Sequence, residues 1–453
     1  MSTSSTLSSV LSALGGTTGI DVTSAVDAIL YADRAPERAW QAQQASLANQ
    51  TSALNQLQSE ASSLSDALSS LQGTTGALSA ATTTSTNLGV VTATAVDGTP
   101  ASSHQIVVTN LASSGSWYSA AESSSSAALP SGSFDITTGT TTRTITVGGT
   151  SGVDTLDQLE ASINSSSLGL TASIVTDSSG ARLSLVSTVS GTAADFSVGN
   201  NSTLSFTRAD TGANAALTID GVPVSSASNT VSGALNGVTL NLQSASVGTP
   251  ITLSVTPDTT SIVSGVTSFI SAYNTLITDV NSQLTYDSST KTAGVLQADS
   301  AVQSLQSQLL NATNYNTGGS SFATLSALGI TTNSDGTLSL NTATLNSAIQ
   351  TNNAAVASFF QGTSSNGFVA SVNTTLDTYN DPTQGAFTVD LQSIASENQD
   401  LTDQTSTLEL YLVSQQSILT AQYNAADIAI QQLPQKLKQI QALLNPNQDS
   451  SSS

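Results

Sequence analysis

Residues 391–444 decide the fold, and they read LQSIASENQDLTDQTSTLELYLVSQQSILTAQYNAADIAIQQLPQKLKQIQALL. Apolar residues recur in this stretch at a spacing of about 3.5, which is typical of a coiled-coil seam. As one helix the stretch would be about 80 Å long, far more than a compact domain needs to cover one face. It therefore predicts a long helix that requires a partner helix.

A second heptad pattern, at residues 38–72, supplies that partner. Pro36 stands in the first turn, where a helix tolerates proline, and Gly73 follows where a helix would end. Core positions of an ordinary helical bundle would also explain the pattern. We favour a coiled coil because both chain ends carry heptads and the middle carries none. The predicted seam consists of Trp40, Leu47, Leu54, Leu57, Leu64, Leu68, Leu71, Ile394, Leu401, Leu408, Leu412, Leu419, Leu433 and Ile440.

Three residues interrupt the C-terminal pattern. Gln415 and Gln422 occupy heptad positions, where buried glutamines would weaken the coil while favouring one register. Pro434 should kink or split the helix near its end. Residues 445–453 are expected to be disordered.

Residues 1–37 are expected to form a disordered, amphipathic N-terminal segment. Two short apolar faces lie in it, and helices of this length are not stable by themselves. A frayed chain end is one interpretation, and a segment that folds only on a partner is the other. The predicted partner-contact residues are Leu7, Val10, Leu11, Leu14, Val22, Val26, Ile29 and Leu30.

Between residues 88 and 256 the apolar period changes to two, as in the alternation of Val238, Leu240 and Leu242 with polar residues. Turn signals such as Asn236-Gly237 separate these runs. Residues 133–198 contain a strand, a short helix (LDQLEASIN) and a hairpin, flanked by polar joins. We interpret this unit as an insertion in a β-rich middle.

These patterns predict a multidomain α+β protein. A terminal α-helical coiled-coil or bundle domain forms from both chain ends, and two β-rich domains are inserted between them. The expected boundaries are 38–80 and 260–444 for the helical domain, 81–115 and 215–259 for the outer β-rich domain, and 116–214 for the inserted domain with its one short helix.

Composition excludes several classes of protein. Only 8% of the 453 residues are charged, and the net charge of -22 reflects just 8 Lys and Arg, so a nucleic-acid footprint is absent. Without cysteine there are no disulfides, thiolate metal sites or cysteine nucleophiles. No apolar window reaches the length of a membrane span, and the first 30 residues do not read as a cleaved signal.

A search for catalytic chemistry returns mostly absences. His104 is the single histidine, which excludes every site built on two, and its place beside a strand fits a partly exposed structural residue better than a catalytic one. Oxygen-rich loops such as residues 287–290 lack the ligand pattern of an EF-hand. We therefore predict neither an enzyme nor a cofactor or metal site.

Four stretches then form a recognisable set: GIDVTSAVDAIL (19–30), GALNGVTLNLQSASVGTPITLSVTPDT (233–259), FISAYNTLITDVNSQLTYDSSTKTAGVLQADSAVQSLQSQL (269–309), and SALGITTNSDGTLSLN with the following TATLNSAIQTNNAAVASFF (326–360). With them the chain resembles the flagellar filament cap protein family, also called the flagellar hook-associated protein 2 family. The 133–198 unit is similar to the repeat inserted in flagellin and cap proteins.

The resemblance implies an extracellular, ring-shaped homo-oligomer at the distal tip of the bacterial flagellum. It further implies helical legs on the filament, a plate of β domains, and a role in promoting flagellin polymerisation and preventing monomer leakage. The implied partners are flagellin, the hook-filament junction proteins and a type III export chaperone, with export that needs no cleaved signal peptide. Scarce Lys and Arg depart from the expected pattern and favour subunit contacts through apolar, hydroxyl and amide groups.

Two alternatives remain at this stage. Another axial flagellar protein, either a flagellin or a hook-filament junction protein, would also combine coiled ends with a β middle. A secreted adhesin or carbohydrate-acting enzyme belongs to a different class, although aromatic residues make up only 4% of the chain.

Overall fold

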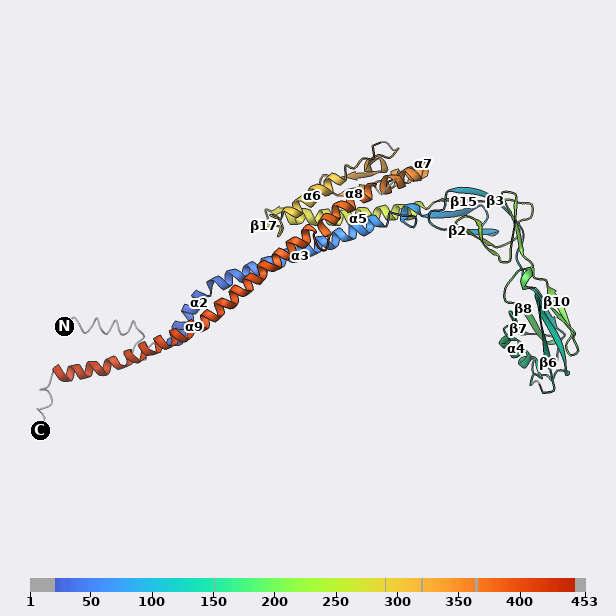
Figure 1. Ribbon diagram of the computed structural model, residues 1–453, viewed down its shortest axis with the longest axis horizontal. Coiled ribbons are helices and arrows are strands. Elements are labelled where there is room, and N and C mark those ends of the chain that lie inside the picture. Colours follow the sequence, from blue (N-terminus) through green and yellow to red (C-terminus); the bar gives the residue numbers. More distant parts are fainter. Residues whose placement is uncertain (1–20, 151, 290, 319–320, 363–365, 445–453) are drawn as a thin grey trace.

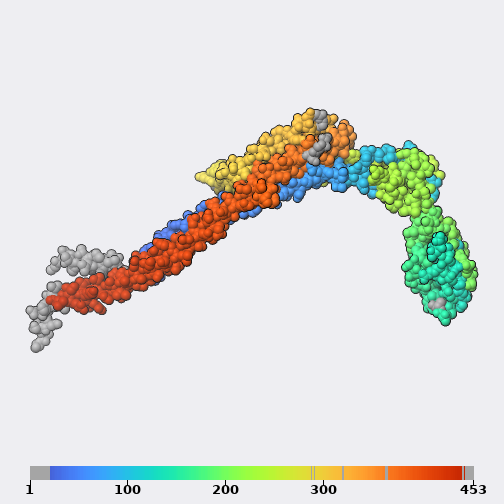
Figure 2. All heavy atoms as spheres, viewed as in Figure 1, coloured from blue at the N-terminus to red at the C-terminus, as the bar shows by residue number. Residues whose placement is uncertain are grey.

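The computed structural model describes residues 21–444 except 151, 290, 319–320 and 363–365. The molecule is a long, bent arm: paired helices form one end, a wider helical region follows, and two β-rich bodies form the other end (Figure 1). Figure 2 shows the same outline in atoms. Separate hydrophobic clusters lie in the helical region and in each β body.

The helical core contains segments from both halves of the chain. Leu54, Leu57 and Leu64 are fully buried there, and Phe368 stacks on Phe359 with ring centroids 5.7 Å apart. Apolar residues at three- and four-residue spacing give each helix a buried face, which accounts for its formation here. The helices are α2 (Val22–Asp33), α3 (Ala35–Ser69), α5 (Thr259–Leu284), α6 (Ser300–Ala312), α7 (Thr342–Gln361), α8 (Phe368–Asn380) and α9 (Ala386–Leu444), with 3-10 turns η2 (Ala77–Ser79) and η4 (Leu325–Leu328).

Two small hairpins accompany the helical core. The first pairs β16 (Tyr286–Asp287) with β17 (Thr292–Ala293), and the second pairs β18 (Ile330–Thr332) with β19 (Leu338–Leu340). Asn274 on α5 fastens the second hairpin, because its side chain donates to the Leu338 carbonyl at 2.8 Å and accepts the Leu338 N–H at 2.6 Å.

The first β body packs two antiparallel sheets over one core. One sheet has the order β1-β15-β3-β11-β12 and the other β13-β14-β2. Alternate residues of β15 and β14 are buried, as the period-two pattern predicts. The strands are β1 (Ala81–Ser85), β2 (Val91–Ala95), β3 (Ser102–Asn110), β11 (Ala215–Ile219), β12 (Val222–Ser226), β13 (Thr230–Leu235), β14 (Val238–Leu242) and β15 (Ile251–Pro257).

In the sequence, the second β body lies wholly between β3 and β11. Its sheets have the orders β10-β4-β8-β7 and β6-β5-β9, and α4 (Leu156–Ser165) packs against β7. Ser113 and Ala213 form a backbone bridge where the chain enters and leaves this body. The strands are β4 (Ser116–Ser119), β5 (Gly132–Thr138), β6 (Thr141–Val147), β7 (Leu170–Asp177), β8 (Gly180–Ser187), β9 (Phe196–Gly199) and β10 (Phe206–Asp210).

The structure differs from the expected local structure at two places. Part of the segment 1–37, which was expected to be disordered, is the helix α2, because its apolar face is buried against α9. Pro434 does not split α9, which runs to Leu444 as one helix of 59 residues and about 90 Å. The predicted disorder of 445–453 falls outside the described residues.

Half-buried carboxyl groups face one another in the helical core. Burial raises the pKa of Glu60 on α3, and the charge of Asp279 on α5 adds to the increase. Burial likewise raises the pKa of Asp390, with Asp299 as the neighbouring charge. Glu60 Oε2, Asp279 Oδ2 and Asp390 Oδ2 are buried and accept no hydrogen bond from the described residues. Ionised carboxylates in such places reduce the stability of the folded state.

Replacing Glu60 by Gln should therefore raise the free energy of unfolding at pH 7 by about 1 kcal/mol, or about 2–4 °C in Tm. A carboxyl group whose folded pKa is raised costs stability above that pKa, and the cost disappears as pH falls toward the unfolded value. The difference in Tm between variant and wild type should accordingly be larger at pH 7 than at pH 5 in thermal unfolding followed by circular dichroism. Asp66→Asn, at an exposed position of the same helix, is the control. A lower Tm for Glu60→Gln at pH 7 would contradict this account.

Candidate functional site

The paired terminal helices are the candidate functional site, because α2 and α9, the first and last helices of the described chain, form the end of the arm (Figure 1). Gln44 Nε2 donates to Thr402 Oγ1 at 3.1 Å, and Gln43 Nε2 donates to Glu397 Oε1 at 2.5 Å. Farther along the arm, Arg34 meets Glu409. From Gln44 to Arg34 the residue numbers decrease, while those of their partners on α9 increase from Thr402 to Glu409. Therefore α9 runs antiparallel to α3 and then to α2.

The predicted seam residues divide between two environments. Those of the second half of α3, together with Leu71 just beyond it, belong to the helical core, where α3 packs against α5 and α8 as well as α9. Ile394 is partly buried against the same core. Toward the tip, Leu47, Leu401 and Leu412 are buried, whereas Trp40, Leu408 and Leu419 are partly buried. The core-lining seam residues are Leu54, Leu57, Leu64, Leu68 and Leu71.

The apolar face of α2 is covered within the chain. Val26 and Leu30 are 3% and 9% exposed and pack with Leu412 of α9, and Val22 lies at the edge of this cluster. Val26 and Leu30 therefore are not free for another protein in this arrangement, contrary to their prediction as partner contacts, whereas Val22 is only partly buried. Ile29 is partly buried beside them. The other predicted contacts, Leu7, Val10, Leu11 and Leu14, fall outside the described residues.

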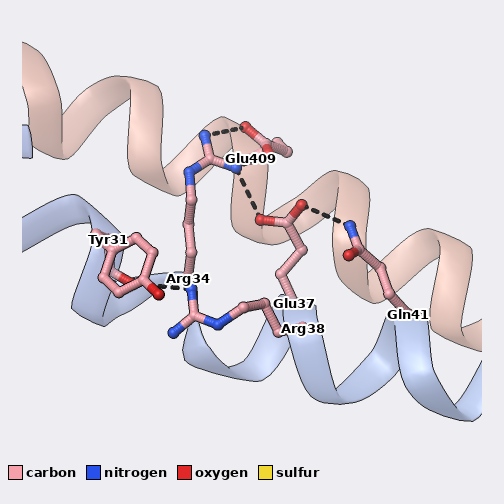
Figure 3. Close-up of polar contacts among 6 residues, drawn as sticks. All are labelled: Tyr31, Arg34, Glu37, Arg38, Gln41 and Glu409. Atoms are coloured by element: carbon pink, nitrogen blue, oxygen red, sulfur yellow. Dashed lines mark hydrogen bonds and ion pairs between the residues drawn. The ribbon is translucent and has the colours of Figure 1, made fainter.

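An arginine fixes the junction of α2 and α3. Arg34 stands between the two helices, and its guanidinium donates to Glu409 through both terminal nitrogens, at 3.0 Å for Nη2, and to Glu37 at 2.7 Å (Figure 3). The hydrogen bond to Glu409 raises the pKa of Arg34, and the same contact lowers the pKa of Glu409. The Arg38 guanidinium lies 4.4 Å from the centre of the Tyr31 ring. The bidentate pair of Arg34 and Glu409 determines the position of α2 along α9.

Leu433 and Ile440 were predicted to be seam residues, but the structure leaves both outside the seam. They are 44% and 51% exposed, because α2 begins at Val22 and no described segment lies along the last turns of α9. Leu437 and Leu443, at 38% and 79% exposed, extend this bare region. The end of α9 thus presents an apolar surface that the described chain leaves uncovered.

The glutamines are not buried in the seam either. Gln422 is exposed and Gln415 only partly buried, while Tyr423 packs into the cluster around Leu412. An α-helix of 3.6 residues per turn drifts about 20° per heptad against a strict seven-residue repeat. The position that faces the cluster therefore moves by one residue along α9, from Gln422 to the partly buried Tyr423.

Sequence reasoning missed Arg34, Glu409 and Tyr423. A signal for the first was available, since Arg34 is one of only 8 cations and directly precedes the Ala-Pro start of a helix. Glu409 gave no comparable signal, because its partner is 375 residues away along the chain.

Truncating Leu412 to Ala should release α2 without unfolding the molecule. Loss of a buried leucine costs about 2–4 kcal/mol, and α2 has little else to hold it, so hydrogen exchange of its backbone amides should accelerate about 30-fold or more. The matched control is Leu410→Ala, two residues away on the same helix, where the side chain is 75% exposed. Equal exchange rates in the two variants would show that the Leu412 contact does not hold α2.

Comparison with known proteins places the chain in a family. The model of the flagellar hook-associated protein 2 N-terminus matches residues 18–115, that of its C-terminus residues 212–435, and the flagellin hook IN motif residues 133–189. The B-type flagellar hook-associated protein 2 of Pseudomonas aeruginosa is 28% identical over 395 residues, which are 79% of this chain and 82% of that protein.

A solved structure gives the same assignment. The D1-D2-D3 domains of the flagellar cap protein FliD from Escherichia coli superimpose with a TM-score of 0.58 and 26% identity, over 76% of this chain and 99% of that one. The chain belongs to the flagellar hook-associated protein 2 family.

Proposed function

We propose that the protein caps the bacterial flagellar filament, as a homo-oligomeric ring at the distal tip that promotes flagellin polymerisation and prevents the loss of monomers. Family membership supports this role. The observation that carries it is the shape of the molecule, in which a helical arm, whose apolar end the described residues leave uncovered, is joined to β bodies at the opposite end (Figure 1). Such a subunit can bind the filament with its helical end and form the plate of the cap with its β bodies.

The arm provides the contact with the filament. On α9 the bare apolar residues Leu433, Leu437, Ile440 and Leu443 would face the filament. Leu7, Val10, Leu11 and Leu14, which share one face at helical spacing, would add to the same contact. Burial of this surface supplies the driving force for docking.

We propose that the protein acts through interfaces, as a structural component of the flagellum. Among the described residues, no three His, Asp or Glu side chains gather as metal ligands. His104 is bound to Asp220, with 2.7 Å between Nδ1 and Oδ2, and this contact lowers the pKa of Asp220. No helix in the described part of the chain has the length and apolarity of a membrane span.

Flagellin is the substrate of this assembly role. We further propose that the subunit meets the hook-filament junction proteins before flagellin arrives, that an export chaperone holds it in the cell, and that it is exported without a cleaved signal peptide. The three hydrophobic cores would act as separate domains, with boundaries near residues 80, 116, 214 and 259.

The proposed function is tested in a strain that lacks the gene. The strain should release unpolymerised flagellin into the medium while hooks remain, and the wild-type gene should restore filaments. Normal filaments on the deletion strain would refute the capping role.

The arm contact is tested by placing charge on the bare surface. The double variant Leu433→Asp/Ile440→Asp should keep the wild-type Tm, because both side chains are already half exposed, and should restore at least tenfold fewer filaments to the deletion strain. Gln435→Asp, also exposed on this part of α9, is the control and should complement fully. Full complementation by the double variant would show that this surface is not the contact with the filament.

Ring assembly should depend on salt in an unusual direction. With a net charge of -22 and 8 Lys and Arg, subunits repel one another and have few cations for ion pairs between copies, so screening should favour association. Light scattering of the purified protein should show a larger oligomeric fraction at 0.5 M than at 0.05 M NaCl. Dissociation by salt would indicate that ion pairs hold the ring, and open filaments would favour a flagellin-like role.

A further inference from the structure

The second β body has one sheet edge that no other part of the described chain covers. This edge is β6, the outer strand of the sheet β6-β5-β9, in the β body farthest from the helical arm (Figure 1). β6 pairs with β5 along its whole length without a register shift, and every residue except Arg143 is β-branched. No proline, glycine, lysine or acidic residue interrupts it. Such a strand is well suited to pair on both of its sides.

The backbone hydrogen-bonding groups of β6 divide between its two sides. On β5, Ser133 turns its N–H and C=O away from β6, because they bond to Ser202 at 2.7 and 2.9 Å. Residues directly opposite each other in an antiparallel pair share this orientation. Thr146 lies opposite Ser133, so Thr146 and, by alternation, Thr144 and Thr142 turn their N–H and C=O groups outward. No described residue bonds to these backbone groups, and all three threonines are exposed.

Other edges of the two β bodies carry groups that obstruct pairing. Pro223 lies at an outward position of β12, where it offers no N–H. On β7, Asn164 of α4 occupies both backbone groups of Ala172, donating to its carbonyl at 2.9 Å and accepting its N–H at 2.8 Å. On β9, the Phe196 carbonyl accepts from Trp117 Nε1 at 3.0 Å. At each of these edges an added strand would meet a missing or an occupied hydrogen-bonding group.

The remaining edges are also unsuited to a long added strand. β10 and β13 contain register shifts, which bend and twist a strand edge. β1 and β2 lie against each other, and Thr83 Oγ1 donates to the Ala93 carbonyl at 2.5 Å. The hairpins of the helical core have strands of two or three residues. Among the described strands, β6 is therefore the one edge that is open along its length, and the edge that matches it is β6 of another copy.

We propose that β6 pairs with β6 of a second copy of this chain, in antiparallel orientation about a two-fold axis at Thr144. The axis places Thr144 opposite Thr144 and Thr142 opposite Thr146, so every outward N–H meets an outward carbonyl. Threonines opposite each other form a favourable cross-strand pair, and Arg143 lies opposite Ile145 instead of opposite the second Arg143. Because β6 has no acidic residue, no carboxylates face each other across the new ladder, although each chain has a net charge of -22.

The symmetry of this contact separates it from the contacts that close a ring. A two-fold contact joins copies in pairs and cannot propagate around a cyclic ring. The β6 pair therefore links two free subunits, or two rings through their β bodies. It goes beyond the proposed capping role, and its test does not depend on that role.

Disulfide formation tests the pairing in the full-length protein, which has no cysteine of its own. In the proposed pair the two Thr144 Cα atoms lie about 5.5 Å apart, within the range that a disulfide spans. Thr144→Cys should therefore give a covalent dimer on mild oxidation in 0.5 M NaCl, where repulsion between the chains is screened.

Thr141→Cys is the matched control. This position is exposed on the same strand, but its two copies in the proposed pair lie about 20 Å apart, and it should give at least tenfold less dimer. Equal yields of dimer from the two variants would overturn the proposal.

A second pair of variants distinguishes backbone pairing from chance collision. In the Thr144→Cys chain, Thr146→Pro removes an outward N–H without removing a bond to β5, and it should lower the yield of dimer at least tenfold. Thr146→Val keeps the N–H and should leave the yield unchanged. If the two variants form equal amounts of dimer while circular dichroism shows both to be folded, β6 does not pair through its backbone and the proposal fails.

Discussion

The structure depends on the burial of the α3 leucines against helices from the opposite end of the chain. Leu54, Leu57 and Leu64 have no exposed surface, and they obtain this burial only because α5, α8 and α9 return to α3. Full burial of one leucine contributes about 1.5–3 kcal/mol, so a few such residues exceed the net stability of a typical domain. Both β bodies lie between α3 and α5 in the sequence, so they are inserted between the segments that make this contact.

Charge plays a small part in holding the molecule together. Half-buried carboxyl groups such as Glu60 and Asp390 stand near other acids and not near bases. Arg34 is the exception in the arm, where its two carboxylate partners fix the junction of α2 and α3. Hydroxyl and amide side chains provide most of the remaining polar contacts, as Asn274 does for the β18–β19 hairpin.

Periodicity predicted the elements and their order well, because it reports directly on which face is buried. The alternation around Leu240 and Leu253 identified strands whose alternate residues are indeed buried. The predicted seam was wrong where the heptad register was extended furthest: it selected Gln422, but in a helix of 3.6 residues per turn the partly buried Tyr423 packs against the cluster instead. Val26 and Leu30 were correctly recognised as an apolar face. This face is covered by α9 of the same chain. That contact is tertiary, and no local pattern in the sequence reports it.

The nested topology has a consequence for the order of folding. The second β body is continuous in sequence and can close as soon as its own residues are available, and the first β body needs only the segments on either side of it. The arm needs both ends, since Arg34 and Glu409 are 375 residues apart. Closing so long a loop is entropically the most expensive step, and partners become available only when the last helix exists. We therefore expect the arm to form last, and a chain that lacks α9 to be unable to assemble it.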